Sequence, residues 1–184
     1  MPIMKKTDIV ISPIGKISPW ISETIAREIR ERFKLPTRIM PLLKDIFFAH
    51  DPQRNQYYST KILDTLEKSA PKECIKLLAV TREDLFIPIL THVYGEARLG
   101  GLPSIISISR LIEYTEIDSR EKNRSRIVKE AAHELGHTFD LRHCPDQTCI
   151  MHYCRKIEEV DQKSDQFCRY CKILLSDSIT ALGG

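Results

Sequence analysis

The chain has 184 residues and a formal net charge of +3, with 42% hydrophobic and 29% charged residues. This composition is typical of a soluble globular protein, and the length suits one domain with a sizeable core. A charge of +3 is too small to favour nucleic acid or an anionic membrane surface, and no apolar stretch is long enough to span a bilayer. We therefore expect a monomer with a single domain over residues 1–184 and neither a nucleic-acid nor a membrane partner.

The first fifteen residues, MPIMKKTDIVISPIG, lack the features of a secretory signal. Their apolar run is short, is broken by Pro13 and Gly15, and is not followed by a small-residue cleavage site. The six cysteines are then expected in a reducing compartment, where metal binding is more common than disulfides. The sequence predicts a cytoplasmic protein.

Hydrophobic patterning predicts strands alternating with helices in the first half of the chain. Short β-branched or apolar runs indicate strands at residues 9–14 and 37–43. Apolar residues at helical spacing indicate a helix that opens at Ser18-Pro19 and reaches Phe33, and a second from about Tyr57 to Ser69. Residues 44–56 are polar and are expected to be irregular.

In the second half, CIKLLAVT (74–81) and SIISISRL (104–111) are predicted strands, the first of them central because it is continuously apolar. VYGEARLGGL (93–102) is rich in glycine and suits an edge strand or a looped hairpin. Asp118 and Glu121 have the spacing of a capping box for a helix that runs to about Phe139. A last helix is expected from Ser164 to Leu182. This order predicts an α/β fold with a mixed sheet.

Three histidines, two cysteines and a methionine occur in residues 133–151, HELGHTFDLRHCPDQTCIM. His133 and His137 are four residues apart, so they lie one turn apart on one face of the predicted helix. Two neutral imidazoles placed in this way can bind Zn²⁺ and leave positions for further ligands. Isolated helical histidines are more often packed or surface residues. The flanking residues are largely apolar, however, which makes His and Glu without a partner costly there.

His143 follows His137 by six residues, which is too far for one more helical turn, so the chain must turn near Asp140 to bring it to the same ion. With Met151 eight residues further on, HExxHxxxxxH resembles the metzincin zinc peptidases, in which HExxHxxGxxH precedes a methionine turn. The longer pattern resembles the archaemetzincins specifically. It adds Cys144, Cys149 and the CxxC at 168–171.

This resemblance implies a compact metzincin-like domain with a mixed twisted sheet, an edge strand over the cleft, an active-site helix and a C-terminal helix. It implies a catalytic zinc on His133, His137 and His143, with Glu134 as general base and Met151 as the hydrophobic floor beneath the metal. Asp140 stands where metzincins usually have glycine, but Asp tolerates a left-handed backbone better than most residues.

Tyr153 matches the position of a zinc-proximal tyrosine in astacin-like metzincins, which makes it a possible transition-state stabiliser. Simple packing is the alternative role for Tyr153. His152 is expected at the surface.

The CxxC at Cys168 and Cys171 is either a redox dithiol or half of a zinc site. It falls within the predicted last helix, with both sulfurs on one face. Together with Cys144 and Cys149 it would supply four thiolates for a closed structural zinc site, which the resemblance also implies. Such a site would staple the C-terminal part, residues 144–184. Two cysteines remain: Cys74 is expected as a buried strand thiol and Cys154 as a bystander.

The predicted function is zinc-dependent hydrolysis of peptide bonds by a zinc-bound water with Glu134 as general base, with two zinc ions per chain and a peptide or protein as substrate. The edge strand could bind the substrate as an added antiparallel strand. Candidate wall residues are Phe86, Tyr94 and Leu99.

Two alternatives remain open. In the first, the chain is a zinc-stapled binding module with an idle cleft, against which the intact Glu134 argues. In the second, it is a gluzincin-type peptidase with Glu158 or Glu159 as third ligand, against which His143 argues.

Overall fold

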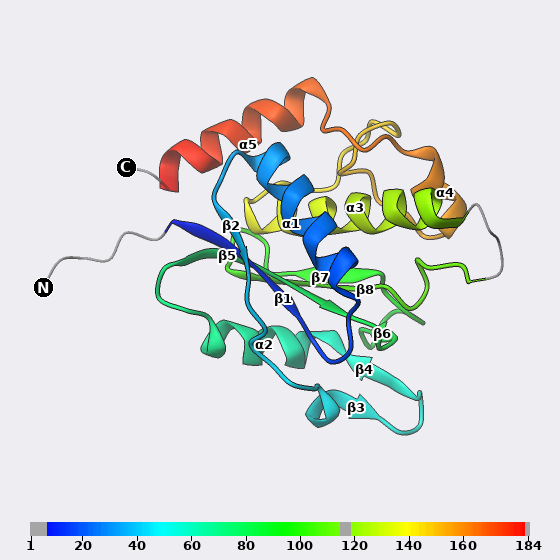
Figure 1. The fold of residues 1–184 in the computed structure, drawn as a ribbon. Coiled ribbons are helices and arrows are strands. Elements are labelled where there is room, and N and C mark those ends of the chain that lie inside the picture. The colour runs from blue at the N-terminus through cyan, green and yellow to red at the C-terminus, as the bar shows by residue number, and fades with distance from the viewer. Residues whose placement is uncertain (1–6, 115–118, 183–184) are drawn as a thin grey trace, which may run out of the picture.

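The computed structural model describes residues 7–114 and 119–182, so the predicted helix start at Asp118 lies outside the described residues (Figure 1). Helices and strands alternate along most of the chain. In order they are β1 (Asp8–Pro13), α1 (Pro19–Phe33), β2 (Thr37–Ile39), the 3₁₀ turn η1 (Phe47–Ala49), β3 (His50–Asp51), β4 (Gln56–Tyr58), α2 (Ser59–Ser69), β5 (Cys74–Thr81), β6 (Leu85–Phe86), β7 (Gly95–Ala97), β8 (Pro103–Ser107), α3 (Ser119–Thr138), α4 (Ile157–Gln162) and α5 (Arg169–Leu182).

A five-stranded sheet with the order β2-β1-β5-β8-β7 forms the centre of the fold. Its first four strands are parallel, and β7 runs antiparallel to β8 at the edge. Helices α1, α3 and α5 lie on one side of this sheet and α2 lies on the other, as Figure 1 shows. A small sheet, β3-β4-β6, extends beside α2. The predicted α/β fold with a mixed sheet and an edge strand is therefore confirmed.

The elements that carry the core follow directly from sequence. Strand β5 is flanked on both sides by parallel strands and covered on both faces, which explains its continuous apolar run. Helix α1 begins with Pro19, whose missing N–H is not needed in the first turn. It buries Ile25, Ile29 and Phe33 against the sheet.

Several expected boundaries were wrong. Strand β2 ends at Ile39 instead of residue 43, because Pro41 cannot donate to the ladder and the Leu42 amide bonds to the Ser12 hydroxyl at 3.0 Å. Residues 44–56 contain η1, β3 and the start of β4. The last helix begins at Arg169, because Ser164 accepts a hydrogen bond from the Gln166 amide in a turn, and residues 157–162 form the separate helix α4. No helix of the described residues has both the length and the apolar composition needed to cross a bilayer.

Candidate metal centres

Helix α3 presents two histidines to the space beneath the edge strand, and the loop after the helix returns a third. One ring nitrogen from each of His133, His137 and His143 lies within 4.8 Å of the others. The Nε2 atoms of His133 and His137 are 3.2 Å apart. His133 is buried, while His143 is exposed, so the group opens to solvent on one side.

Backbone carbonyls fix the orientation of the two helical imidazoles. His133 Nδ1 lies 2.8 Å from the Ile150 carbonyl oxygen, and His137 Nδ1 lies 2.7 Å from that of Leu141. A carbonyl only accepts, so each Nδ1 carries the proton and each Nε2 presents a lone pair to the other. Two facing lone pairs repel unless a cation lies between them. A tetrahedral zinc with Zn–N bonds of about 2.0–2.1 Å places its ligand nitrogens about 3.3 Å apart, so these residues fit zinc.

The protonation of the three rings also suits a metal. Burial lowers the pKa of His133 far below its usual range, and lowers the pKa of His137 to about 4. Burial likewise lowers the pKa of His143. All three are therefore neutral at pH 7, which is the form that binds metal.

The turn at Asp140 brings the third histidine back to the helix. Asp140 has φ of 65°, the left-handed conformation that glycine usually supplies at this place. Its amide donates to the His137 carbonyl at 3.0 Å, and the Leu141 amide donates to the Gly136 carbonyl at 3.2 Å. This pair of bonds is a Schellman motif, which satisfies the last carbonyls of α3 and reverses the chain. Lys76 Nζ completes the helix end by donating to the Thr138 carbonyl at 2.5 Å.

Met151 packs against α3 at Gly136, the one residue of this helix that has no side chain. It is fully buried, and a Cβ placed on Gly136 would lie 2.6 Å from its sulfur. The preceding residue, Ile150, supplies the carbonyl that orients His133. The methionine turn is thus tied to the histidine group by packing and by a hydrogen bond.

Glu134 is buried between α3 and the edge strand. A Cβ on Gly95 would lie 2.5 Å from Glu134 Cγ and 2.6 Å from the Ile105 carbonyl oxygen, so β7 approaches the carboxylate through a glycine. Burial raises the pKa of Glu134 well above its usual range, with the neighbouring Glu130 carboxylate adding to the rise and the Lys163 ammonium opposing it. The contact between Gly95 and Glu134 was not predicted, although a glycine within a predicted edge strand is a signal that another group approaches the backbone closely.

A cleft of about 960 Å³ joins these groups. The predicted wall residues Tyr94 and Leu99 line it. Phe86 does not, which corrects that prediction: its side chain is buried and stacks on Tyr58 with ring centres 5.6 Å apart. The remaining lining residues come from the loop before β7, from β7 itself, from α3 and from the segment after it: Ile87, Leu90, Thr91, His92, Val93, Gly95, Glu96, Ala97, Glu130, His133, Glu134, His137, Arg142, His143, Tyr153, Cys154 and Arg155.

Tyr153 and Cys154 lie in this cleft beside the third histidine. The Tyr153 ring centre is 4.9 Å from that of His143. Burial raises the pKa of the Cys154 thiol to about 11, so it stays protonated. His152, expected at the surface, is half-buried instead, because its Nδ1 pairs with the Cys144 carbonyl at 3.0 Å.

The four cysteines of the second group come together from two segments. The sulfurs of Cys144, Cys149, Cys168 and Cys171 lie within 4.8 Å of one another, and those of Cys144 and Cys168 are 3.8 Å apart. A tetrahedral zinc with Zn–S bonds of about 2.3 Å separates its sulfurs by about 3.8 Å, whereas a disulfide needs about 2.05 Å. None of the six cysteines, which all lie in the described part of the chain, forms a disulfide. The donor set therefore fits a closed zinc site.

Two further details concern the cysteines. Cys168 lies just before α5, which begins at Arg169, so the CxxC does not sit within the helix as predicted. The Cys168 amide donates to the Cys149 sulfur at 3.3 Å and the Cys171 amide to the Cys168 sulfur at 3.5 Å. Cys74 is a buried thiol in β5, as expected.

The sequence similarity of this chain to known proteins agrees with this geometry. The sequence model of Peptidase family M54 matches residues 9–177. An archaemetzincin from Methanopyrus kandleri is 37% identical over 163 residues, which are 89% of this chain and 83% of the relative. The chain belongs to the archaemetzincins. It is therefore a member of a family of zinc-dependent peptidases.

Solved archaemetzincin structures share the fold. The crystal structure of the archaemetzincin from Methanopyrus kandleri superimposes with a TM-score of 0.85 at 31% identity, covering 97% of this chain and 98% of that one. The structure of a zinc-dependent peptidase from Methanocorpusculum labreanum has a TM-score of 0.81 at 28% identity, covering 91% and 99% of the two chains. The archaemetzincin resemblance predicted from residues 133–171 is thus confirmed over nearly the whole chain.

Buried charges behind this archaemetzincin site were missed in the sequence. Lys163 Nζ lies 2.8 Å from Glu130 Oε1, with side-chain exposures of 1% and 5%. Lys163 also donates to the His152 carbonyl at 3.5 Å. The pair links α3 to the segment that carries Tyr153. In the sequence this ion pair is indicated only by Glu130, a charged residue on a largely apolar helix, and that pattern does not identify Lys163 as the partner.

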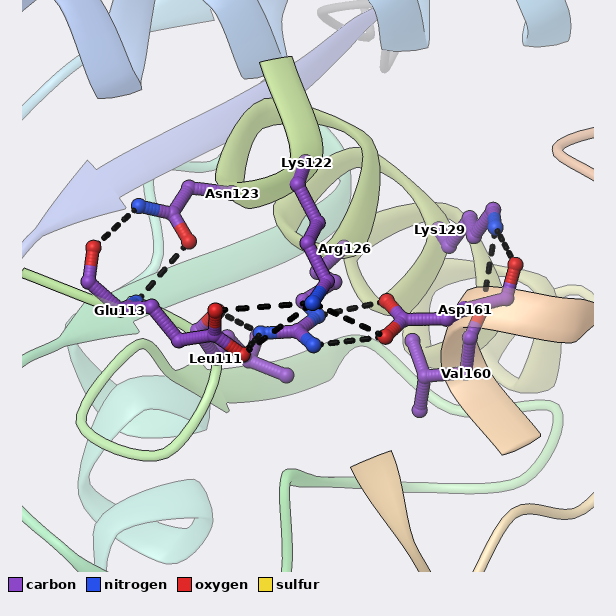
Figure 2. Close-up of polar contacts among 8 residues, drawn as sticks. All are labelled: Leu111, Glu113, Lys122, Asn123, Arg126, Lys129, Val160 and Asp161. Atoms are coloured by element: carbon purple, nitrogen blue, oxygen red, sulfur yellow. Dashed lines mark hydrogen bonds and ion pairs between the residues drawn. The ribbon is translucent and has the colours of Figure 1, made fainter. Parts of the chain in front are cut away.

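A second polar cluster joins α3 to α4, as Figure 2 shows. The Arg126 guanidinium binds both carboxylate oxygens of Asp161 at 2.6 Å and Glu113 Oε1 at 2.7 Å. Lys129 Nζ donates to the carbonyls of Val160 at 2.9 Å and Asp161 at 3.0 Å. These bonds fix the short helix α4, which has little apolar surface of its own, against the middle of α3.

Proposed function

We propose that this chain hydrolyses peptide bonds with zinc held by His133, His137 and His143 and with Glu134 as general base. The observation that carries the proposal is the 3.2 Å distance between the Nε2 atoms of His133 and His137, in a cleft that also holds Glu134. When bound there, zinc would polarise the scissile carbonyl and make the attacking water more acidic. The idle binding module is disfavoured because a scaffold has no need of a buried carboxylate beside the histidines.

Glu134 has the properties of a proton acceptor in this scheme. Its raised pKa makes the carboxylate a stronger base than an exposed glutamate, so it can take the proton of the attacking water and pass it to the leaving amine. Glu130, the other acidic group nearby on α3, is held by Lys163. The exposed Tyr153 phenol lies beside His143 and can donate a hydrogen bond to the developing oxyanion.

The edge strand offers a place for an extended peptide. The Arg98 amide donates to the Pro103 carbonyl and the Ser107 amide to the Tyr94 carbonyl, so Tyr94 and Arg98, on either side of β7, face β8, and by alternation Glu96 faces it too. The N–H and C=O groups of Gly95 and Ala97 therefore point to the outer edge, which is unpaired among the described residues. A substrate added antiparallel to β7 would bond to these groups beside Glu134.

The cysteine group is proposed to hold a second, structural zinc that staples residues 144–184. The Ile150 amide already donates to the Gln166 carbonyl at 2.9 Å, and the Ser164 amide donates to that of Thr148 at 3.0 Å. Four thiolates leave no open coordination position, so this site would serve folding and would hold the methionine turn in place.

Substitution of Glu134 by Gln tests the mechanism. The variant should keep both zinc ions, measured by elemental analysis, while chelator-sensitive hydrolysis of a mixed peptide library falls about 10²–10⁴-fold. The exposed Glu158 is the matched control: Glu158→Gln should retain activity and zinc. Full activity in a zinc-loaded Glu134→Gln protein would refute the mechanism.

Two other outcomes would support the alternatives. Zinc loss in Glu158→Gln would support the gluzincin assignment. Hydrolysis that is absent from the wild type, or insensitive to chelator, would favour the binding module.

A further inference from the structure

The relative direction of α3 and β7 distinguishes the two ends of the cleft. The Gly100 amide donates to the His137 carbonyl at 2.9 Å, so the C-terminal end of α3 lies beside the residues that follow β7. Gly95 contacts Glu134, nearly one turn earlier on the helix. Helix and strand thus run in the same direction. A peptide antiparallel to β7 has its N-terminal part near Leu99 and its C-terminal part, which becomes the leaving group, near Tyr94.

The segment from Tyr153 to Arg155, which leads into α4, forms the wall at the leaving-group end: Cys154 is close enough to interact electrostatically with Tyr94 and with Glu130, which lies one turn before Glu134 on α3. The polar cluster in Figure 2 fixes the position of that segment, because Arg126 and Lys129 hold α4 against the middle of α3. Lys163 adds a bond to the His152 carbonyl. Arg155 is therefore carried on an anchored wall at the end of the cleft that receives the residues after the scissile bond.

Among the side chains that line this end of the cleft, Arg155 is the one charged group without an ion-pair partner in the described part of the chain. Glu158 and Glu159 lie outside the lining, and the Glu159 carboxylate accepts hydrogen bonds from the Arg155 and Lys156 amides. The side chains here that can be charged near neutral pH are Glu130, His92 and Arg155, beside the neutral groups of Tyr94, Tyr153 and Cys154. The Lys163 ion pair offsets the charge of Glu130. His92 is neutral at pH 7, since burial and then the nearby Arg110 lower its pKa.

Arg155 is exposed and forms no ion pair within residues 7–114 and 119–182. Its guanidinium lies 5.9 Å from the centre of the Tyr153 ring, which in turn stands against His143.

We propose that Arg155 makes the leaving-group end of the cleft a subsite for a carboxylate. The inference rests on the proposed function and names its substrate class: peptides with Asp or Glu shortly after the scissile bond, or peptides that end there in a free α-carboxylate. A guanidinium binds a carboxylate through two parallel hydrogen bonds. The aromatic ring beneath it stabilises the cation and restricts its side chain, which reduces the entropy lost on binding.

Matched peptides test the subsite. The cleavage position found with the mixed library is kept, and Glu is compared with Gln at each of the three following positions in amidated peptides. A second pair of short peptides compares a free C-terminal carboxylate with an amide. We expect the carboxylate to raise kcat/KM roughly fivefold, equivalent to about 1 kcal/mol, the upper end for exposed ion pairs. The ratio should shrink at 1 M salt, where screening acts over about 3 Å.

Variants assign the effect to one residue. Arg155→Gln should bring the ratio close to 1. Lys156→Gln removes the same charge one residue away, outside the cleft lining, and should keep the ratio of the wild type. Arg155→Glu should reverse the preference in favour of Lys over Gln, and zinc content with melting temperature shows that each variant is folded.

The outcomes separate this inference from the proposed function. Absence of any chelator-sensitive hydrolysis would refute the function itself. Hydrolysis at equal rates for charged and neutral peptides would refute only the subsite, as would a ratio that persists in Arg155→Gln. A wild-type preference for Lys would assign this end to Glu130 and would also overturn the proposal. A preference confined to one peptide pair supports the subsite and identifies its source as either side chain or chain end.

Discussion

Gly136 should not tolerate a side chain, although alanine is normally preferred inside a helix. A Cβ there would lie 2.6 Å from the Met151 sulfur, 3.2 Å from its Cε and 3.4 Å from Leu141 Cδ1. Ordinary contacts of this kind are about 3.5–4.0 Å, so the fully buried Met151 sulfur must move by about 1 Å. Alanine gains about 1 kcal/mol of helix propensity over glycine. Overpacking costs about 1–3 kcal/mol.

Gly136→Ala should therefore lower the free energy of unfolding by about 1 kcal/mol. It should also weaken zinc binding by the histidines, because Met151 follows the residue whose carbonyl orients His133. Denaturant unfolding at fixed zinc concentration measures the first effect, and competition with a chromogenic chelator measures the second.

A double-mutant cycle identifies the cause. Met151→Ala alone should cost about 2–5 kcal/mol, because it leaves a cavity. Combined with Gly136→Ala it should cost less than the sum, since the new methyl group occupies part of that cavity, with a coupling of about 0.5–3 kcal/mol. The Leu141→Ala cycle should show weaker coupling, because that contact is longer. Losses that add within about 0.5 kcal/mol in the Met151 cycle would refute the reasoning.

Three further predictions concern other parts of the structure. Cys171→Ser should lower the melting temperature by roughly 10 °C or more, and by much more than Glu134→Gln, because a closed metal site contributes directly to folding. Equal shifts in thermal scans would contradict the structural role. Asp140→Gly should keep or slightly raise the free energy of unfolding, whereas Asp140→Ala should lower it by about 1 kcal/mol, since φ is 65°. Denaturant titrations in which alanine is the more stable of the two would contradict this. Hydrogen bonds from Arg126 hold the pKa of Asp161 below its usual range. That stabilisation is present above the unfolded pKa, near 3.9, and is lost as pH falls through the folded pKa. The stability difference between the wild type and Arg126→Met should therefore shrink below about pH 4, and a difference that stays constant from pH 6 to about pH 2.5 would contradict it.

The parts of the fold that could be predicted are those encoded by local sequence. Strand β5 was predicted to its end residues, because a parallel strand buried on both faces is mostly apolar, as β5 is apart from Lys76 and Thr81. His133 and His137 could be placed on one helix face from their spacing alone. The turn at Asp140 involves only six residues, Gly136 to Leu141, so its left-handed backbone could also be anticipated.

The parts that could not be predicted depend on partners distant in sequence. Strands β3, β4 and β6 have two or three residues each, so pairing defines them more than their own composition does. Helix α4 is six residues long and depends on Arg126 and Lys129 of α3. The partner of Glu130 is 33 residues away, and nothing in the local pattern identifies Lys163. The need for glycine at position 95 arises from the packing of Glu134 of α3 against it, which the local sequence does not show.

The length of β7 has a consequence for solubility. A strand with an open edge can pair with any other chain, including another copy of its own protein, and long edges of this kind promote aggregation. Strand β7 has three residues, or about 10 Å of ladder, and Arg98 follows it immediately. That span can align a few residues of a flexible peptide, but it is too short to recruit a second sheet. A short open edge of this kind is compatible with the proposed peptide binding while it limits pairing between copies of the chain.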